Sequence, residues 1–219
     1  METLIEYVRV LGEQNKGKKE GEMWNILGET FLMMEIRDNN RLRVNEMLAS
    51  KPNLELTGHC GSTALHEACS RGNSGIVADL VAANANVTAR NLFGYTPLML
   101  ATRTGLDQKT FSVDEKIKMM QILLDAGAEK DAVDQDGKNA LHWAVGSGAN
   151  QRIVQFLIDA GVNVNAKTYG TNMTPLHTHL YTYFGWQDII DALLKAGADT
   201  TAMDKWGRTP NALMNTRQP

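Results

Sequence analysis

The chain has 219 residues, enough for one large domain or two small ones, and its 43% hydrophobic and 21% charged residues are typical of a soluble globular protein. A formal net charge of −3 argues against nucleic acid or an anionic membrane as the partner. Two cysteines are too few for a disulfide framework, and no apolar stretch approaches the length of a membrane span. We therefore expect an intracellular protein of the cytoplasm or the nucleus.

The first element that we expect is a helix at about residues 3–13. Its sequence places Glu2, Glu6 and Arg9 where a secretory signal needs an unbroken apolar run. The lysines of NKGKKEGE (15–22) are diluted by glutamates and glycines, which favours a solvated linker over a basic recognition motif. We expect residues 1–27 to form this N-terminal helix and a flexible linker, which together cap the rest of the chain.

A repeated segment follows the linker. Its copies are GETFLMMEI (28–36), GSTALHEACSRG (61–72), GYTPLMLATRTG (94–105), GKNALHWAVGSG (137–148), NMTPLHTHLYTYFG (172–185) and the truncated GRTPNALM (207–214). The equivalent position, called the anchor below, is held by Leu32, Leu65, Leu98, Leu141, Leu176 and, as an imperfect match, Asn211. Successive anchors are 33, 33, 43, 35 and 35 residues apart, and self-similarity at this spacing indicates a repeat architecture.

A second helix follows each of the four middle copies. Apolar pairs recur four residues apart, which places them on one face of a helix. These pairs begin at Ile76-Val77, Met119-Met120, Ile153-Val154 and Ile189-Ile190. Each stripe ends at a residue that tolerates the left-handed conformation closing a helix, namely Asn84, Gly127, Gly161 or Gly197. Each unit therefore reads as a short helix, a turn, a longer helix, a stop and an extended link.

These units resemble the ankyrin-repeat family through TPLH, LHEA, LHWA, IVQFLIDAGVNVNA and IIDALLKAGADTTA, in register over about residues 28–214. The chain departs from the family where Met33 and Met99 replace the usual histidine, and where the first and last units are eroded. The resemblance implies an all-α solenoid of stacked helix-turn-helix units with β-hairpin-like fingers, about five units plus a truncated C-terminal cap. We expect the ankyrin-repeat domain to span 28–219, with units at about 28–60, 61–93, 94–136, 137–171 and 172–206 and a partial unit at 207–219.

The third copy carries about ten extra residues, GLDQKTFSVD (105–114), at the turn between its two helices. SVDE (112–115) has the pattern of a capping box, so we expect the second helix to begin near Val113 and the preceding loop to display Phe111. Insertions in repeat arrays collect on one face, which is often a binding face. A neutral surface loop remains the alternative, because such insertions cost little stability.

The fingers are the candidate binding site. The family's frame implies that their tips point toward the concave side, where ankyrin proteins bind partners. Apolar and aromatic tips in a charged surround also have the composition of interface hot spots, although some of these rings could instead pack on the neighbouring finger. The predicted partner-binding residues are Arg71, Leu92, Phe93, Tyr95, Gln135, Asp136, Lys138, Trp143, Tyr169, Met173, Lys205, Trp206 and Arg208. A secondary contact edge beside the insertion would comprise Phe111, Tyr181 and Trp186.

Catalytic and metal sites are not expected. The family's repeated histidines, His66, His142 and His177, are implied to bond neighbouring backbone and tie the units together. His177 and His179 lie two residues apart and so cannot readily bind one metal from the same helix. HC at 59–60 and HEAC at 66–69 lack a third group to orient a base. We therefore predict no catalytic residue, metal or cofactor.

The function expected from these features is a monomeric, non-catalytic protein-binding module, acting as an adaptor, scaffold or inhibitor. Two alternatives stay open. One is a ligand-sensing or enzymatic repeat protein that uses 105–114 as a lid, and the other is a structural spacer without a specific partner.

Overall fold

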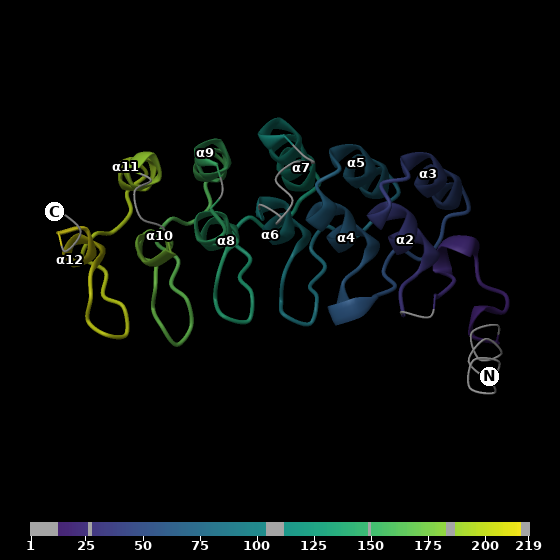
Figure 1. Ribbon diagram of the computed structural model, residues 1–219, viewed down its shortest axis with the longest axis horizontal. Coiled ribbons are helices and arrows are strands. Elements are labelled where there is room, and N and C mark those ends of the chain that lie inside the picture. The colour runs from purple at the N-terminus through teal and green to yellow at the C-terminus, as the bar shows by residue number, and fades with distance from the viewer. Residues whose placement is uncertain (1–12, 26–27, 104–111, 149, 183–186, 216–219) are drawn as a thin grey trace.

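The computed structural model describes residues 13–25, 28–103, 112–148, 150–182 and 187–215, which form a row of helix pairs with hairpin-like fingers projecting on one side (Figure 1). The first helices of the units are α2 (Phe31–Arg37), α4 (Ala64–Arg71), α6 (Pro97–Thr102), α8 (Ala140–Gly146), α10 (Pro175–Thr182) and α12 (Pro210–Asn215). The second helices are α3 (Arg41–Ala49), α5 (Ser74–Ala82), α7 (Val113–Asp125), α9 (Gln151–Asp159) and α11 (Gln187–Lys195). Two short 3-10 helices, η1 (Glu20–Glu22) and η2 (His59–Gly61), precede α2 and α4.

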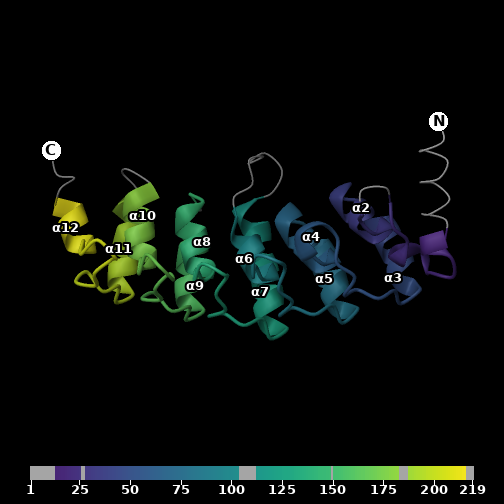
Figure 2. The same cartoon turned by 90° about the horizontal axis from the view of Figure 1, so that it is seen from below.

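The helices form two layers. The first helices lie in the layer next to the fingers and the second helices in the layer behind it (Figure 1). Seen at 90°, successive units lie side by side along the long axis of the molecule (Figure 2). The fingers and the first helices therefore share one surface, which we call the finger face.

The core runs through all units as a continuous apolar layer. The five anchor leucines are each at most 2% exposed. The apolar pairs predicted for the second helices pack in the same core, where Ile76, Leu123, Ile153 and Leu157 are completely buried. Removing one such side chain from water stabilises the fold by about 1.5–3 kcal/mol, so the register of the repeats follows from the leucine and isoleucine spacing.

Short polar side chains start the helices. The hydroxyl of Thr96 accepts a hydrogen bond from the Met99 amide, and the Ser112 hydroxyl accepts one from the Glu115 amide at 3.2 Å. The second helix of the third unit begins at Val113, as predicted from its capping serine. Phe111 and most of the insertion lie outside the described residues.

Left-handed residues end the second helices, as the sequence predicts. Asn84, Gly127, Gly161 and Gly197 have φ values of 66°, 90°, 75° and 86°. Glycine adopts this conformation without the steric cost of a Cβ atom, which explains its use at three of these positions.

The segment 15–22, predicted to be a solvated linker, leaves four of its eight residues exposed and also contacts the first unit. Gly21 is buried, and a carboxylate oxygen of Glu22 accepts a hydrogen bond from the Asn53 amide at 2.6 Å. Glu20 forms an ion pair with Arg43 on α3. The segment is thus solvated on one side and held against the first unit on the other. Most of the predicted helix at 3–13 lies outside the described residues.

We predict that Leu141→Ala lowers the free energy of unfolding by about 2–5 kcal/mol, because a fully buried anchor leaves a cavity between two units. Urea unfolding followed by circular dichroism measures the change. Leu42→Ala is the matched control, since Leu42 is 75% exposed on α3 and its truncation should change stability by no more than about 0.5 kcal/mol. Equal losses in the two variants would contradict the assignment of the anchor.

Candidate functional site

The fingers are joined to one another through their backbones. In each case a tip amide donates to a carbonyl of the preceding finger, at 2.7–3.1 Å. The pairs are Leu92 to Cys60, Gln135 to Phe93, Tyr169 to Asp136 and Lys205 to Thr171. This ladder fixes the spacing of the fingers and presents their side chains as one row.

A polar side chain closes each of three fingers, and in two of them it is buried. One oxygen of Asp134 accepts the amides of Asp136 and Lys138, both at 2.9 Å. Asp204 accepts two amides in the same way, and so does the amide oxygen of Asn91. Asp134 is only 3% exposed, so its carboxylate organises the finger from inside and is shielded from solvent.

The repeated histidines connect each unit to the next finger. The Nδ1 atom of His66 accepts the Thr63 amide at 3.2 Å, so its Nε2–H donates to the Tyr95 carbonyl at 2.9 Å. Equivalent Nε2 bonds run from His142 to Met173 and from His177 to Arg208, at 3.0 and 3.1 Å.

Burial keeps two of these imidazoles neutral. Desolvation lowers the pKa of His66, and it lowers the pKa of His142 to about 4. His179 is also buried. No group of three or more histidine, cysteine or acidic side chains in the described part of the chain could hold a metal ion. Burial raises the pKa of the Cys69 thiol, which leaves it a poor nucleophile.

An aromatic cluster, here the central cluster, joins the finger at residues 91–95 to α8. The rings of Phe93 and Tyr95 stack at 5.4 Å, and Tyr95 meets Trp143 edge-on at 4.5 Å. The Trp143 indole N–H donates to Asp134 at 2.9 Å, and the Arg103 guanidinium lies 5.5 Å from the Trp143 ring centre. Tyr95 also packs on the hydrophobic core, so it supports Phe93 and is not a free tip.

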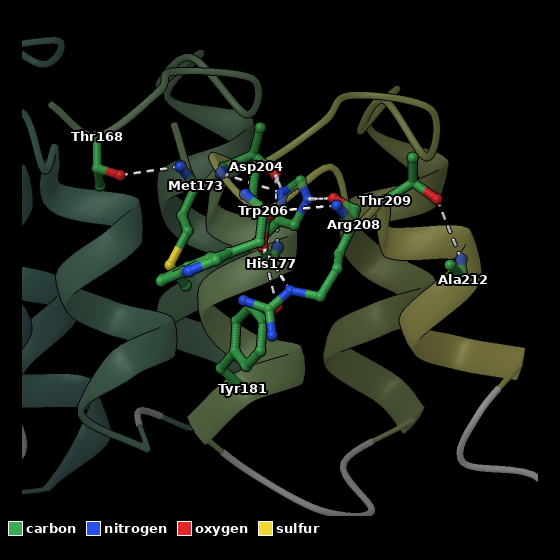
Figure 3. Close-up of polar contacts among 10 residues, drawn as sticks. Thr168, Met173, His177, Tyr181, Asp204, Trp206, Arg208, Thr209 and Ala212 are labelled. Carbon is green, nitrogen blue, oxygen red and sulfur yellow. Dashed lines mark hydrogen bonds and ion pairs between the residues drawn. The ribbon is translucent and has the colours of Figure 1, made fainter. Parts of the chain in front are cut away.

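A second group, here the C-terminal cluster, comprises Tyr181, Asp204, Trp206 and Arg208 (Figure 3), together with Lys205, whose ammonium group lies over the Trp206 ring. The Arg208 guanidinium lies 4.3 Å from the Trp206 ring centre and 4.7 Å from the Tyr181 ring centre. Asp204 accepts the Tyr181 hydroxyl at 3.0 Å and the Arg208 Nε–H at 3.1 Å. Burial alone would raise the pKa of Asp204. The hydrogen bonds that its carboxylate accepts from the backbone N–H groups of Arg208 and Trp206 lower this pKa below its usual value, so the carboxylate is ionised.

Tyr181, predicted for the secondary contact edge, lies near the C-terminal end of α10 (Pro175–Thr182), and its hydroxyl donates to Asp204 of the next finger. Its place in a secondary contact edge stays a prediction. Trp186, the other aromatic predicted for that edge in this unit, lies outside the described residues.

The remaining predicted residues divide into apolar tips and polar links. Leu92 and Tyr169 are 69% and 63% exposed, whereas Met173 is half-buried. Gln135 donates to the Leu92 carbonyl at 2.6 Å, so its amide joins two fingers. Lys138 pairs with Asp136 at 3.0 Å, and Arg71 pairs with Glu67 on α4 at 2.9 Å.

Sequence reasoning missed three residues of these clusters: Arg103, Asp134 and Asp204. The two aspartates could have been found from their spacing, because Asn91, Asp134 and Asp204 each lie seven residues before an anchor position. No pattern in the sequence identifies Arg103, because its contact is with the ring of Trp143 in the next unit.

Comparison with known proteins agrees with this architecture. The family model described as ankyrin repeats (3 copies) matches residues 32–112 and 110–204. The mouse B-cell lymphoma 3 protein homolog is 27% identical over 96% of this chain and 45% of its own length. Mouse NF-kappa-B inhibitor delta is 27% identical over 85% of this chain and 62% of its own length. This chain thus spans less than two thirds of either relative.

A solved structure gives the same result. The ankyrin repeat domain of Bcl-3, titled a unique member of the IkappaB protein family, superposes with a TM-score of 0.74 and 26% identity, covering 94% of this chain and 86% of that one. The predicted all-α ankyrin-repeat solenoid is confirmed. The prediction that the chain is not an enzyme agrees with these relatives, none of which is named for a catalytic activity.

We predict that acid destabilises the protein partly through His142. The unfolded chain binds a proton at this residue near pH 6.5, but the folded chain binds it only near pH 4. The contribution of neutral His142 to the free energy of unfolding is therefore fully present above about pH 6.5 and is lost as the pH falls toward 4. In His142→Met, the decrease in the free energy of unfolding between about pH 6.5 and pH 4 should be smaller by up to about 3 kcal/mol, as measured by urea unfolding at several pH values. Methionine is the matched replacement because Met33 and Met99 occupy the same repeat position. Parallel pH profiles for the two proteins would rule this contribution out.

Proposed function

Because the chain belongs to the ankyrin-repeat family, we propose that it is a non-catalytic binding module that holds a partner protein against its finger face. In this proposal it works inside the cell as a monomeric adaptor, scaffold or inhibitor. The name of NF-kappa-B inhibitor delta, a relative over most of this chain, supports the class of protein-binding inhibitor and leaves the partner open.

The observation that carries the proposal is the position of the exposed apolar side chains. Seven large hydrophobic residues are exposed in the part of the chain that the structure describes, and four of them are finger tips. These four are Leu92, Phe93, Tyr169 and Trp206, which are 69%, 45%, 63% and 55% exposed. Exposed aromatic side chains gathered on one surface are typical of protein interfaces.

The rigidity of the fingers also supports binding. The backbone ladder and the buried Asp134 and Asp204 hold the tips in place before any partner arrives. A pre-organised surface loses less conformational entropy on association, so more of the contact energy appears as affinity.

The two alternatives have less support. The lid hypothesis depends on 105–114, most of which lies outside the described residues. A structural spacer would not account for four exposed apolar tips in one row. Among the described residues, no helix is both long enough and apolar enough to cross a bilayer.

We expect the triple variant Phe93→Ala, Tyr169→Ala and Trp206→Ala to lose its partner, with affinity at least about tenfold weaker, because truncation of each hot-spot residue costs more than about 1 kcal/mol. Affinity capture from extracts of the source cells, compared by mass spectrometry with the unchanged protein, measures the loss. The double variant Leu42→Ala and Leu194→Ala is the matched control, since it removes exposed leucines from α3 and α11.

Circular dichroism and thermal unfolding should show both variants folded. If the triple variant captures the same proteins with unchanged affinity, the finger face is not the binding surface.

A further inference from the structure

We propose that the C-terminal cluster is a carboxylate-binding subsite that receives an acidic segment of the partner protein. This inference rests on the proposed protein-binding function and specifies the chemistry of the partner at one end of the finger face. The group that would contact the partner's carboxylate is the Arg208 guanidinium, with Lys205 beside it.

The first argument is the way in which Arg208 is held. Trp206 and Tyr181 lie near its guanidinium at 4.3 and 4.7 Å, and its Nε–H is bonded to Asp204 (Figure 3). Its two terminal nitrogens have no hydrogen-bond partner among the described residues, and the side chain is 41% exposed. A planar guanidinium fixed in this way offers a fork of N–H donors, which matches the two oxygens of a carboxylate.

The second argument is charge. Asp204 is 4% exposed, and its oxygens accept two amides, the Tyr181 hydroxyl and the Arg208 Nε–H. This acid is therefore turned inward and satisfied. Lys205 adds a second exposed cation 4.4 Å from the Trp206 ring centre. The cluster has two cations and one internal carboxylate, which leaves one positive charge for a singly charged carboxylate from the partner.

The third argument is a contrast within the chain. The finger at 134–138, here the central finger, has the sequence DQDGK, and the finger at 204–208, here the C-terminal finger, has the sequence DKWGR. In the central finger, Asp136 is 69% exposed on its side chain and neutralises Lys138 at 3.0 Å. Trp206 occupies the position equivalent to Asp136, so the C-terminal finger lacks this exposed carboxylate, and the Arg208 guanidinium lies against an aromatic ring instead.

The test uses synthetic probes with the full chain. Acetylated and amidated hexaglutamate is titrated into the isotope-labelled protein, and NMR follows the Trp206 indole N–H and the Arg208 Nε–H. We expect saturable shifts with a Kd of about 1 mM or tighter, which weaken as salt is added. Hexaglutamine of the same length, which lacks the charges, should give no saturable shift.

Two variants locate the effect. Arg208→Gln should weaken hexaglutamate binding at least about tenfold. The finger exchange Lys205→Gln, Trp206→Asp and Arg208→Lys should do the same, and its binding is followed through the backbone amide of Gly207, because the exchange removes both side-chain reporters. This exchange keeps a foldable finger, because the same five residues already form the finger at 134–138. Arg152→Gln, which removes an exposed cation from α9, is the matched control and should leave binding within about twofold.

Several results would overturn the inference. They are the absence of saturable shifts up to about 5 mM hexaglutamate, equal shifts with hexaglutamine, and unchanged binding by Arg208→Gln. Tighter binding of a phosphoserine peptide would assign the subsite to a phosphate group, and tighter binding of hexaglycine with a free C-terminus would assign it to a chain-terminal carboxylate; either result would remove the acidic segment. A partner that the triple fingertip variant loses but Arg208→Gln retains would leave the proposed function standing and remove only the acidic segment.

Discussion

Each helix pair can bury its apolar stripe only against the next pair, and the rest of the structure follows from this constraint. The anchor leucines lie in the shared core, so the units must stack in one register. The same register brings the Nε2 atoms of His66, His142 and His177 to a carbonyl of the following finger. Core and fingers are therefore fixed together, and most of the extra residues of the third copy fall between its two helices, α6 and α7.

The contacts that repeat along the chain could be predicted from the sequence. The buried anchors, the left-handed helix ends and the start of α7 at Val113 each follow from a local pattern of residue types. Such features depend on spacing within one unit or on the same position in the next. Repetition confirms them several times in one chain, which makes a single sequence unusually informative.

The contacts made once could not be predicted. Tyr181 reaches Asp204, and Arg103 lies over Trp143, because side chains that are far apart in the sequence meet at those points. The segment 15–22 is held against α3 for a similar reason, since its charges find partners that its own composition does not reveal. Spacing within a unit says where a residue sits but not which neighbour its side chain reaches.

The finger aspartates link the scaffold to the surface that we propose for binding. One oxygen of Asp204 accepts the amides that shape the finger, and the other holds Tyr181 and Arg208. Asp134 performs the first task in the same way and holds Trp143 with its second oxygen. The backbone turn and the orientation of the exposed ring or guanidinium thus depend on one buried carboxylate. A finger can then exchange its tip residues, as Asp136 and Trp206 illustrate, and change the chemistry that it presents while its fold is kept.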